Sequence, residues 1–388
     1  MPGSTIDSAK FPAGAAVRLR NSQDPACCLE ARATLLIVAI LAIAGLLLGW
    51  NLGNLPSRPA ATEPATGPAA IAPDLALYRD IIREVRSGRN YYSVAGEKIP
   101  QYGFPIRSPL NWRLPTYAWT LSLLPNKCWI QAVLLLLAIT GLGLAFVAKS
   151  RDSGTAQAGI TALILFGVLR WTFDGYAYLA QEVWAAVLIV ISFSAHSLGS
   201  KDNRWRVVAI GAGLAALFFR ELALPYCGIA CLVAAWHRRW KETAAWTAGI
   251  AAFMCFFAWH VSQVRLQLAA TETTAAAGLS QWLQFGGLDY VLLTTRMNSL
   301  LFAAPAALLW LYLLAALLGL SHRQYDQVPN ETNQVACLAV LAYLIAFSFV
   351  GRPENFYWGL MPAPLLAWGV VSGVSSITER CRSAFAVN

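Results

Sequence analysis

The chain has 388 residues, of which 57% are hydrophobic and 13% are charged. A soluble domain carries about twice that share of charged residues, and apolar runs long enough to span a bilayer recur along the whole chain. These features exclude a soluble globular enzyme and predict an all-α, polytopic membrane protein. The formal net charge is +9, but the basic residues lie mostly beside the predicted spans, which argues against a nucleic-acid partner.

The first apolar run, 33–50, follows a leader of 32 residues and is longer than the apolar core of a secretory signal. We therefore expect a retained anchor. Residues 1–32 then form a cytoplasmic N-terminal tail, and 33–388 form one transmembrane domain. A long first outer loop, 51–128, separates this anchor from the next predicted span.

The loop begins with a spacer rich in Pro and Ala and continues with a predicted amphipathic helix over 74–88. Apolar residues recur there at helical spacing, basic residues fill the other face, and Gly88 ends the helix. Such a helix, held between two spans, is expected in the outer membrane interface. Asp74 suits an N-cap, and Asp80 falls on the solvated face. Beyond the helix, prolines and aromatic residues predict an ordered, non-helical cover over an interfacial cavity.

Further apolar runs predict spans at 129–147, 156–171, 183–198, 243–260, 299–320, 335–350 and 359–374. The run 207–236 is different, because Arg220 and Glu221 lie at its centre and basic clusters flank both ends. A single span would bury two charges at mid-membrane, at about 2.5–3.5 kcal/mol each, and would put the two clusters on opposite sides. A short-armed hairpin avoids both costs. It gives about ten membrane segments with both termini cytoplasmic.

The outer segments of this topology carry several short motifs. They are Asp74-x-x-x-Tyr78, Gly88, Tyr91-Tyr92, Arg107-Ser-Pro109, Gln181-Glu182, Arg220-Glu221 and the run GRPENFYWGLMPAPLLAWG at 351–369. Together these resemble the outer segments of the GT-C membrane glycosyltransferases. The resemblance covers most of the chain as architecture.

This resemblance implies a GT-C-like fold and the transfer of a hexose or pentose, with inversion, at the non-cytoplasmic face. The donor would be a lipid-linked, polyprenyl-phosphate sugar, and the acceptor a glycan, a lipid or a protein. A carboxylate in the first outer loop of such enzymes acts as a base or binds a metal, and here it is Asp74. Many relatives have two adjacent acids there, whereas Pro73 and Leu75 flank Asp74, which favours a base without metal or other cofactor. We expect a multi-pass protein of a bacterial inner membrane, surrounded by membrane lipids.

The residue types suit this chemistry. A carboxylate takes the proton of the acceptor hydroxyl, and a departing phosphate needs fixed positive charge. With Asp74 as the catalytic residue, the predicted substrate-binding residues are Tyr78, Arg107, Arg113, Glu182, Arg220, Glu221, Arg352 and Tyr357. Other aromatic residues of this face suit stacking on sugars, although anchoring at the interface is their commoner role; they are Trp112, Tyr117, Trp171, Tyr176 and Trp358.

Structural alternatives remain open for the arginines, because Arg220 also suits a pair with Glu221, and Arg352 a pair with Glu354. A second hypothesis for the whole chain is a polytopic transporter or lipid flippase without transferase activity. Transporters typically carry internal repeats with broken helices at matching positions. This chain shows one broken hairpin and an asymmetric long loop, which favours the enzyme. A non-catalytic scaffold would have little use for so many Arg and Trp residues at one face.

Overall fold

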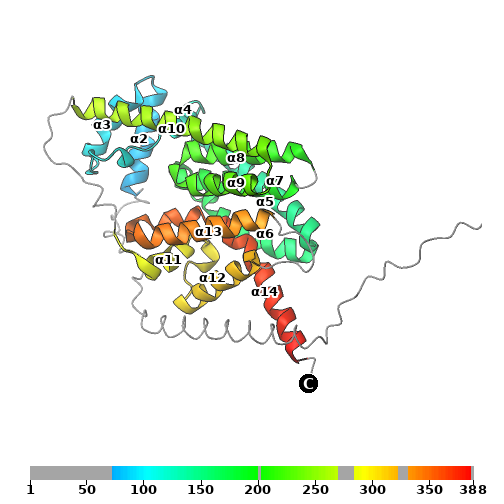
Figure 1. Cartoon of the computed structure of the whole chain (residues 1–388). Coiled ribbons are helices and arrows are strands. Elements are labelled where there is room, and N and C mark those ends of the chain that lie inside the picture. Colours follow the sequence, from blue (N-terminus) through cyan, green and yellow to red (C-terminus); the bar gives the residue numbers. More distant parts are fainter. Residues whose placement is uncertain (1–71, 200–201, 270–283, 322–330, 386–388) are drawn as a thin grey trace, which may run out of the picture.

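The computed structural model describes residues 72–199, 202–269, 284–321 and 331–385, and within these ranges the chain is helical without a strand (Figure 1). The all-α prediction is confirmed. The predicted tail 1–32 and the predicted first span 33–50 lie outside the described residues.

The bundle contains a helix for every predicted span of the described ranges. These helices are α5 (Lys127–Ser153), α6 (Thr155–Leu169), α7 (Gln181–Leu198), α8 (Asn203–Phe219), α9 (Leu224–Trp236), α10 (Trp240–Ala269), α12 (Ala306–Ser321), α13 (Glu331–Phe349) and α14 (Ala363–Phe385). In the described part of the chain, five helical stretches are long and apolar enough to cross a membrane. A sixth is added if the 3₁₀ segment Pro353–Leu360 and helix α14, which are bent by 65° relative to each other, count as one span.

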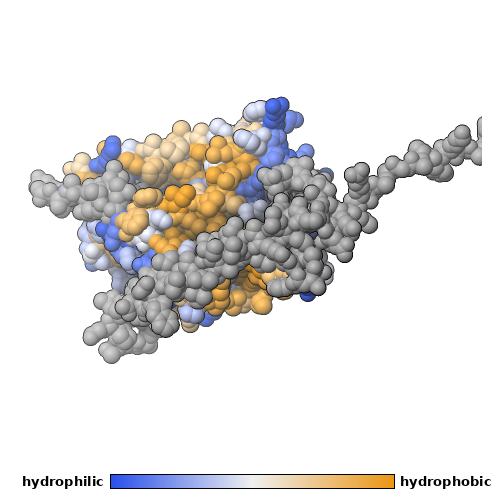
Figure 2. Space-filling view, turned by 60° about the horizontal axis from the view of Figure 1, so that its bottom comes forward, coloured by the Kyte–Doolittle hydropathy of each residue, from blue (hydrophilic) through white to orange (hydrophobic). Residues whose placement is uncertain are grey.

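Apolar side chains cover much of the outside of this bundle. Figure 2 shows them as a broad band on one face, with hydrophilic residues gathered toward its two ends. A helical bundle that exposes an apolar belt of this kind is stable in lipid, because each helix satisfies its own backbone hydrogen bonds there. The protein is therefore an integral membrane protein, as the composition predicts.

Helix α7 lies at the centre of the bundle. All of its 18 residues are buried, and it packs against α5 and α8. A helix that is apolar around its whole circumference belongs inside a bundle. Its first turn consequently carries Gln181 and Glu182 into the interior, where each is less than 4% exposed.

Helices α12 and α14 approach each other closely through glycine. A Cβ atom added to Gly319 would lie 1.9 Å from the carbonyl oxygen of Gly369, so no larger residue fits there without separating the helices. Small residues at helix contacts are typical of membrane proteins, because close packing replaces the hydrophobic effect as the driving force.

The predicted hairpin is confirmed. Helix α8 ends at Phe219, Arg220 is extended (φ −148°, ψ 116°), and the 3₁₀ turn η4 (Glu221–Ala223) leads into α9. Neighbouring helices hold this break through two backbone carbonyls: the Thr116 hydroxyl donates to Phe218, and the Tyr343 hydroxyl donates to Leu222 at 2.8 Å.

The basic clusters on either side of the hairpin lie at the same end of the bundle. Arg206 and Arg239 both approach Oε2 of Glu242, at 3.7 and 3.1 Å, and Arg239 also pairs with Glu331 of α13 at 2.7 Å. A single straight span would hold these clusters a membrane's thickness apart, so this contact supports the hairpin.

The first outer loop folds into helices α2 (Pro73–Arg86), α3 (Tyr91–Gln101) and α4 (Pro115–Ser122), with a short 3₁₀ turn η1 (Pro109–Asn111). The predicted helix over 74–88 is confirmed as α2, and its place in the membrane interface stays a prediction. The prediction of a non-helical cover is wrong. The Asn90 side chain caps α3 by accepting from the amide of Tyr92 at 2.9 Å. Pro115 opens α4, where its missing N–H has no helical partner to lose. The irregular part is limited mainly to 102–114.

This loop unit docks onto the bundle through His260 of α10, which is fully buried. Its Nε2 lies 3.1 Å from the carbonyl oxygen of Trp112, and its Nδ1 lies 3.0 Å from the hydroxyl of Tyr92. A carbonyl only accepts, so Nε2 carries the proton and Nδ1 accepts from Tyr92. His260 thereby joins α3 and the irregular segment to α10.

Shorter helices complete the end of the bundle where α2 and α3 lie, at the left of Figure 1; we call it the α2 end. They are η2 (Arg170–Phe173), η3 (Ala177–Leu179), α11 (Gly287–Thr295), η6 (Ser299–Leu301) and η7 (Pro353–Leu360). The predicted span 299–320 is shorter than expected: α12 begins at Ala306, and the separate turn η6, capped by Asn298 through the amide of Leu300, precedes it.

Candidate active site

A cavity of about 570 Å³ opens at the α2 end. Its lining residues come from three segments that are far apart in the sequence: the start of α2, the irregular segment after α3, and η7 with the residue before it. They are Pro73, Asp74, Leu77, Tyr78, Phe104, Pro105, Asn111, Arg113, Arg352, Glu354, Asn355, Tyr357 and Trp358. Five of the nine predicted site residues are therefore in one place.

Asp74 lies in the first turn of α2 and faces this cavity. The helix begins at Pro73 with Ala72 as its N-cap residue, so the interpretation of Asp74 as the N-cap is wrong. Its Oδ1 accepts from the amide of Leu75 at 2.8 Å. Burial raises the pKa of the Asp74 carboxyl, against the lowering effect of the Leu75 amide, and the negative charge of Glu182 raises it further. A carboxylate of raised pKa accepts a proton more readily.

Arg113 lines the cavity and is held by two side-chain hydrogen bonds. Its Nε donates to the hydroxyl of Tyr78 at 2.8 Å and its Nη2 to the hydroxyl of Tyr357 at 3.3 Å. Its guanidinium carbon also lies 5.6 Å from the centre of the Tyr78 ring. Burial raises the pKa of Tyr78 to about 12 and also raises that of Tyr357, so both hydroxyls stay neutral and neither neutralises the charge of Arg113. Among the described residues, Arg113 forms no ion pair with a carboxylate.

Arg352, the residue before η7, also lines the cavity and is partly exposed. Its Nη1 lies 3.6 Å from Glu354 Oε1, a long and exposed pair of little energetic weight. Its Nε is buried and has no hydrogen-bond partner in the described structure. Both sequence-based interpretations of Arg352 therefore remain open: it reaches the cavity, and it also faces Glu354.

Arg220 is not among the residues that line the cavity. Arg220 is 1% exposed; its Nε lies 2.8 Å from Glu182 Oε1 and its Nη1 lies 2.6 Å from Glu221 Oε1. The extended backbone at the α8–α9 break turns this side chain inward, toward the buried first turn of α7. Glu182, Arg220 and Glu221 thus form an ionic cluster in which Glu182 and Arg220 are buried and Glu221 is partly exposed, and their substrate contact stays a prediction.

Arg107 also stands apart from the cavity lining, although it belongs to the same irregular segment. Its Nη2 is buried without a hydrogen-bond partner among the described residues. Of the aromatic candidates, Trp358 lines the cavity. Trp112 and Tyr117 are buried packing residues whose polar atoms donate to the backbone carbonyls of Ile106 and Leu179.

Comparison with known proteins identifies the architecture. No protein-family model matches the chain, and no curated protein matches its sequence. Solved structures that share its fold include ArnT from Cupriavidus metallidurans bound to undecaprenyl phosphate and the same protein in the apo state. The TM-score is 0.50 for both, with 14% and 15% sequence identity. The alignments cover 88% and 89% of this chain.

The chain shares the fold of ArnT. It spans 60% of the length of those ArnT chains, less than two thirds. The expectation drawn from the short outer motifs is thereby confirmed at the level of the fold. The described part of the predicted first outer loop, 51–128, contains the unit formed by α2, α3 and α4.

Sequence reasoning missed several lining residues of this cavity. Asn111, Glu354 and Asn355 supply amide and carboxylate groups that suit sugar hydroxyls. Glu354 and Asn355 lie in the 351–369 run that carried the resemblance. Their closeness in sequence to Tyr357 could have predicted that they line the same site. Phe104 and Pro105 had no such signal, because their place depends on how the segment after α3 turns toward α2.

Proposed function

We propose that the protein is a glycosyltransferase that moves a sugar from a polyprenyl-phosphate donor to an acceptor hydroxyl, with Asp74 as the general base. One observation carries the proposal: a single cavity at the α2 end brings Asp74 together with Arg113 and Arg352. A proton acceptor and fixed positive charge are the two requirements of transfer from a phosphate leaving group. The GT-C fold shared with ArnT supports the same reading.

The proposed reaction is a direct displacement. Asp74 takes the proton from the acceptor hydroxyl as its oxygen forms a bond to the anomeric carbon. The bond from that carbon to the phosphate oxygen breaks, and its electron pair leaves with the polyprenyl phosphate. One displacement inverts the configuration of the anomeric carbon. Asp74 ends the cycle protonated and returns its proton to water through the open cavity.

The positive charges would hold the leaving group. Arg113 is kept in place by two tyrosine hydroxyls and has no competing carboxylate within ion-pair distance in the described structure. Its charge is therefore available to a phosphate, to which a guanidinium donates strongly. Arg352 lines the same cavity and gains a better partner when a phosphate replaces its long contact with Glu354.

The remaining parts of the proposal concern the metal, the side of the membrane and the substrates. We propose a base without a metal, because Pro73 and Leu75 leave one carboxylate in the first turn of α2. We place the α2 end at the non-cytoplasmic face of a bacterial inner membrane, with both termini cytoplasmic. Glu182, Arg220 and Glu221 would support the donor site from behind, and Tyr78 and Tyr357 would contact the donor beside Arg113. The acceptor is a glycan, a lipid or a protein.

Purified protein in liposomes tests this function. Incubated with a panel of undecaprenyl-phosphate hexoses and pentoses and mixed acceptors from bacterial envelopes, it should release undecaprenyl phosphate from at least one donor. The Asp74→Asn variant should not. Accelerated movement of a labelled donor across the bilayer, without release of undecaprenyl phosphate from any donor, would instead identify a flippase.

A further inference from the structure

The irregular wall of the cavity contains few regular backbone hydrogen bonds. Between the end of α3 and the start of α4, side chains hold the backbone in place: Asn111 Nδ2 donates to the carbonyl of Pro105 at 2.7 Å, and Trp112 Nε1 donates to the carbonyl of Ile106 at 2.6 Å. These contacts hold the wall to itself. The amide of Phe104 donates to the carbonyl of Ile99 in α3 at 3.1 Å, and one further contact joins this first part of the wall, Phe104 and Pro105, to α2 through the residue two positions before Phe104.

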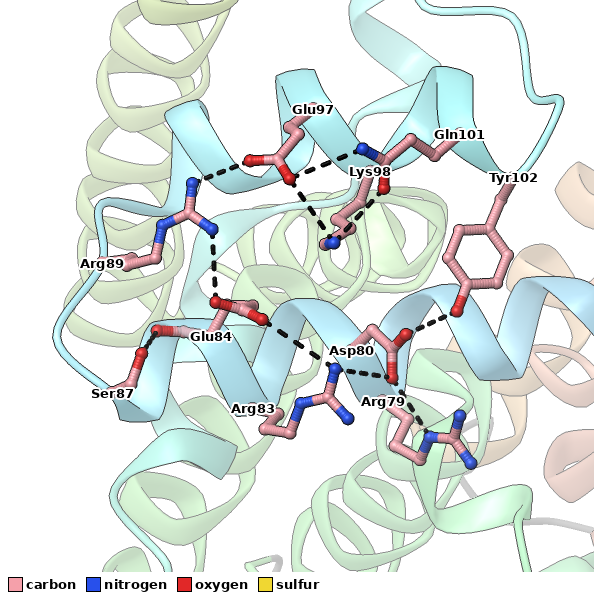
Figure 3. Close-up of polar contacts among 10 residues, drawn as sticks. All are labelled: Arg79, Asp80, Arg83, Glu84, Ser87, Arg89, Glu97, Lys98, Gln101 and Tyr102. Atoms are coloured by element: carbon pink, nitrogen blue, oxygen red, sulfur yellow. Dashed lines mark hydrogen bonds and ion pairs between the residues drawn. The ribbon is translucent and has the colours of Figure 1, made fainter.

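That contact is the hydrogen bond from the Tyr102 hydroxyl to Asp80 Oδ2, at 2.5 Å (Figure 3). Asp80 lies on α2, six residues after Asp74, and Tyr102 lies two residues before Phe104. Gly103, at φ +76°, then turns the chain sharply from Tyr102 into the cavity edge. The bond thus joins the helix that carries the proposed base to the segment that forms the facing edge.

The two oxygens of Asp80 have different partners. Oδ1 faces Arg79 at 3.3 Å and Arg83 at 3.5 Å, and both arginines are largely exposed. Oδ2 accepts from Tyr102 alone among the contacts described. Burial disfavours the charged carboxylate, but the Tyr102 hydrogen bond and the two arginines outweigh it and lower the pKa of Asp80. Asp80 therefore stays ionised at neutral pH, and Tyr102 donates to a charged acceptor, the stronger kind of hydrogen bond.

We propose that Asp80 and Tyr102 are positioning residues whose hydrogen bond fixes Phe104 and Pro105 against α2 and so sets how tightly the donor is held. The inference rests on the proposed function for its effect on catalysis. Asp74 and Arg113 are held by other hydrogen bonds. The transfer step within the bound complex should therefore persist when the Tyr102–Asp80 hydrogen bond is lost. The sequence suggested a solvated Asp80, and the structure gives its carboxylate a partner beside the cavity.

The variants separate this bond from its surroundings. Tyr102→Phe removes one hydroxyl and keeps the ring. Arg83→Ala removes an ion pair from the same carboxylate but keeps the Tyr102 bond, and an exposed pair of this kind has little weight. Tyr226→Phe removes a tyrosine hydroxyl that contacts Ser192 at 2.9 Å inside the bundle, away from the cavity.

Hydrogen exchange tests the geometry without any ligand. In Tyr102→Phe, amide exchange in the peptide 102–108 should accelerate about tenfold, because a hydrogen bond to a charged group is lost. Exchange in α2 should stay unchanged, as should exchange at 102–108 in the two control variants. Unchanged exchange at 102–108 in Tyr102→Phe would overturn the positioning role.

Binding and kinetics test the consequence. Tyr102→Phe should raise the Kd for undecaprenyl phosphate and the donor KM about three- to tenfold, with kcat within about twofold and the melting temperature nearly unchanged. A loss of folded protein would lower kcat and leave KM alone. Equal KM and Kd in Tyr102→Phe and wild type, or an equal rise in Arg83→Ala, would refute the inference. A wild-type protein that binds undecaprenyl phosphate but transfers no sugar would refute the proposed function while leaving this comparison intact.

Discussion

Arg113 donates to the hydroxyl of Tyr78 across 2.8 Å, and this bond joins the irregular wall of the cavity to the helix that carries Asp74. The two residues are 35 positions apart. Because both partners of Arg113 are neutral hydroxyls, the guanidinium is oriented without being neutralised. An oriented cation without a direct carboxylate partner suits an incoming phosphate.

Arg113 should therefore dominate donor binding. Arg113→Lys keeps the charge but loses the planar fork, and we expect it to weaken undecaprenyl phosphate binding about tenfold; Arg113→Ala should weaken it further. Equilibrium binding to purified protein measures both. Arg83→Ala, which removes an exposed arginine of α2 outside the cavity, is the matched control. Wild-type affinity in Arg113→Ala would rule out this residue as the phosphate contact.

Arg220 and Arg352 should respond differently to truncation. Arg352→Ala should weaken donor binding with little change in melting temperature, because its side chain is half-exposed. Arg220→Ala leaves the charge of Glu182 buried without its partner, a loss of about 3–5 kcal/mol in the free energy of unfolding. Pairing Arg220→Met with Glu182→Gln should restore much of that stability. A stable Arg220→Ala variant with a selective loss of donor affinity would show that Arg220 contacts the donor.

The sequence predicted the parts of the site that depend on local pattern. The spacing of apolar residues placed α2, and its first turn placed Asp74 beside Tyr78. The charges of the 207–236 run placed the break at Arg220. The helix period of apolar residues determines α2, and the thickness of the membrane determines where the charged run must break. Both can therefore be read from a local stretch of sequence.

The rest depends on contacts between distant segments. The burial of Arg220 requires Glu182 from another helix, which no local pattern indicates. The helix α3 was missed because its aromatic residues and Pro100 suggest an irregular segment, whereas the Asn90 cap starts the helix and the proline falls in its last turn. The place of Arg113 depends on Tyr357, 244 residues away.

The raised pKa of Asp74 has a consequence for pH dependence. A general base must be ionised, so the kcat/KM of the transfer should fall as the pH decreases through the pKa of Asp74, which lies above that of a free aspartate. The folded state holds this proton more tightly than the unfolded chain does. Ionisation of Asp74 therefore lowers stability as the pH rises through the interval between the two pKa values. A pH–rate profile measured beside the melting temperature checks both directions, and a profile that is flat on its acidic side would contradict the assignment of the base.

The topology predicts which residues reagents can reach. Both basic clusters flanking the hairpin should be cytoplasmic, since Arg and Lys are enriched on that side of membrane proteins. A single cysteine at position 204, in a background without other cysteines, should react with a membrane-impermeant maleimide only after the membrane is opened. Labelling of position 204 in intact cells would reverse the orientation and place the cavity on the cytoplasmic side.

The Asp74→Asn variant tests the central claim most directly. The amide keeps the size of the side chain and its Leu75 contact but cannot take a proton from a hydroxyl, and it removes a carboxylate whose ionisation is disfavoured by burial. With the donor that the wild type uses, we expect kcat to fall by about 10²–10⁴, while undecaprenyl phosphate binding and melting temperature remain near those of the wild type. Turnover by Asp74→Asn within a few-fold of the wild type would contradict the account.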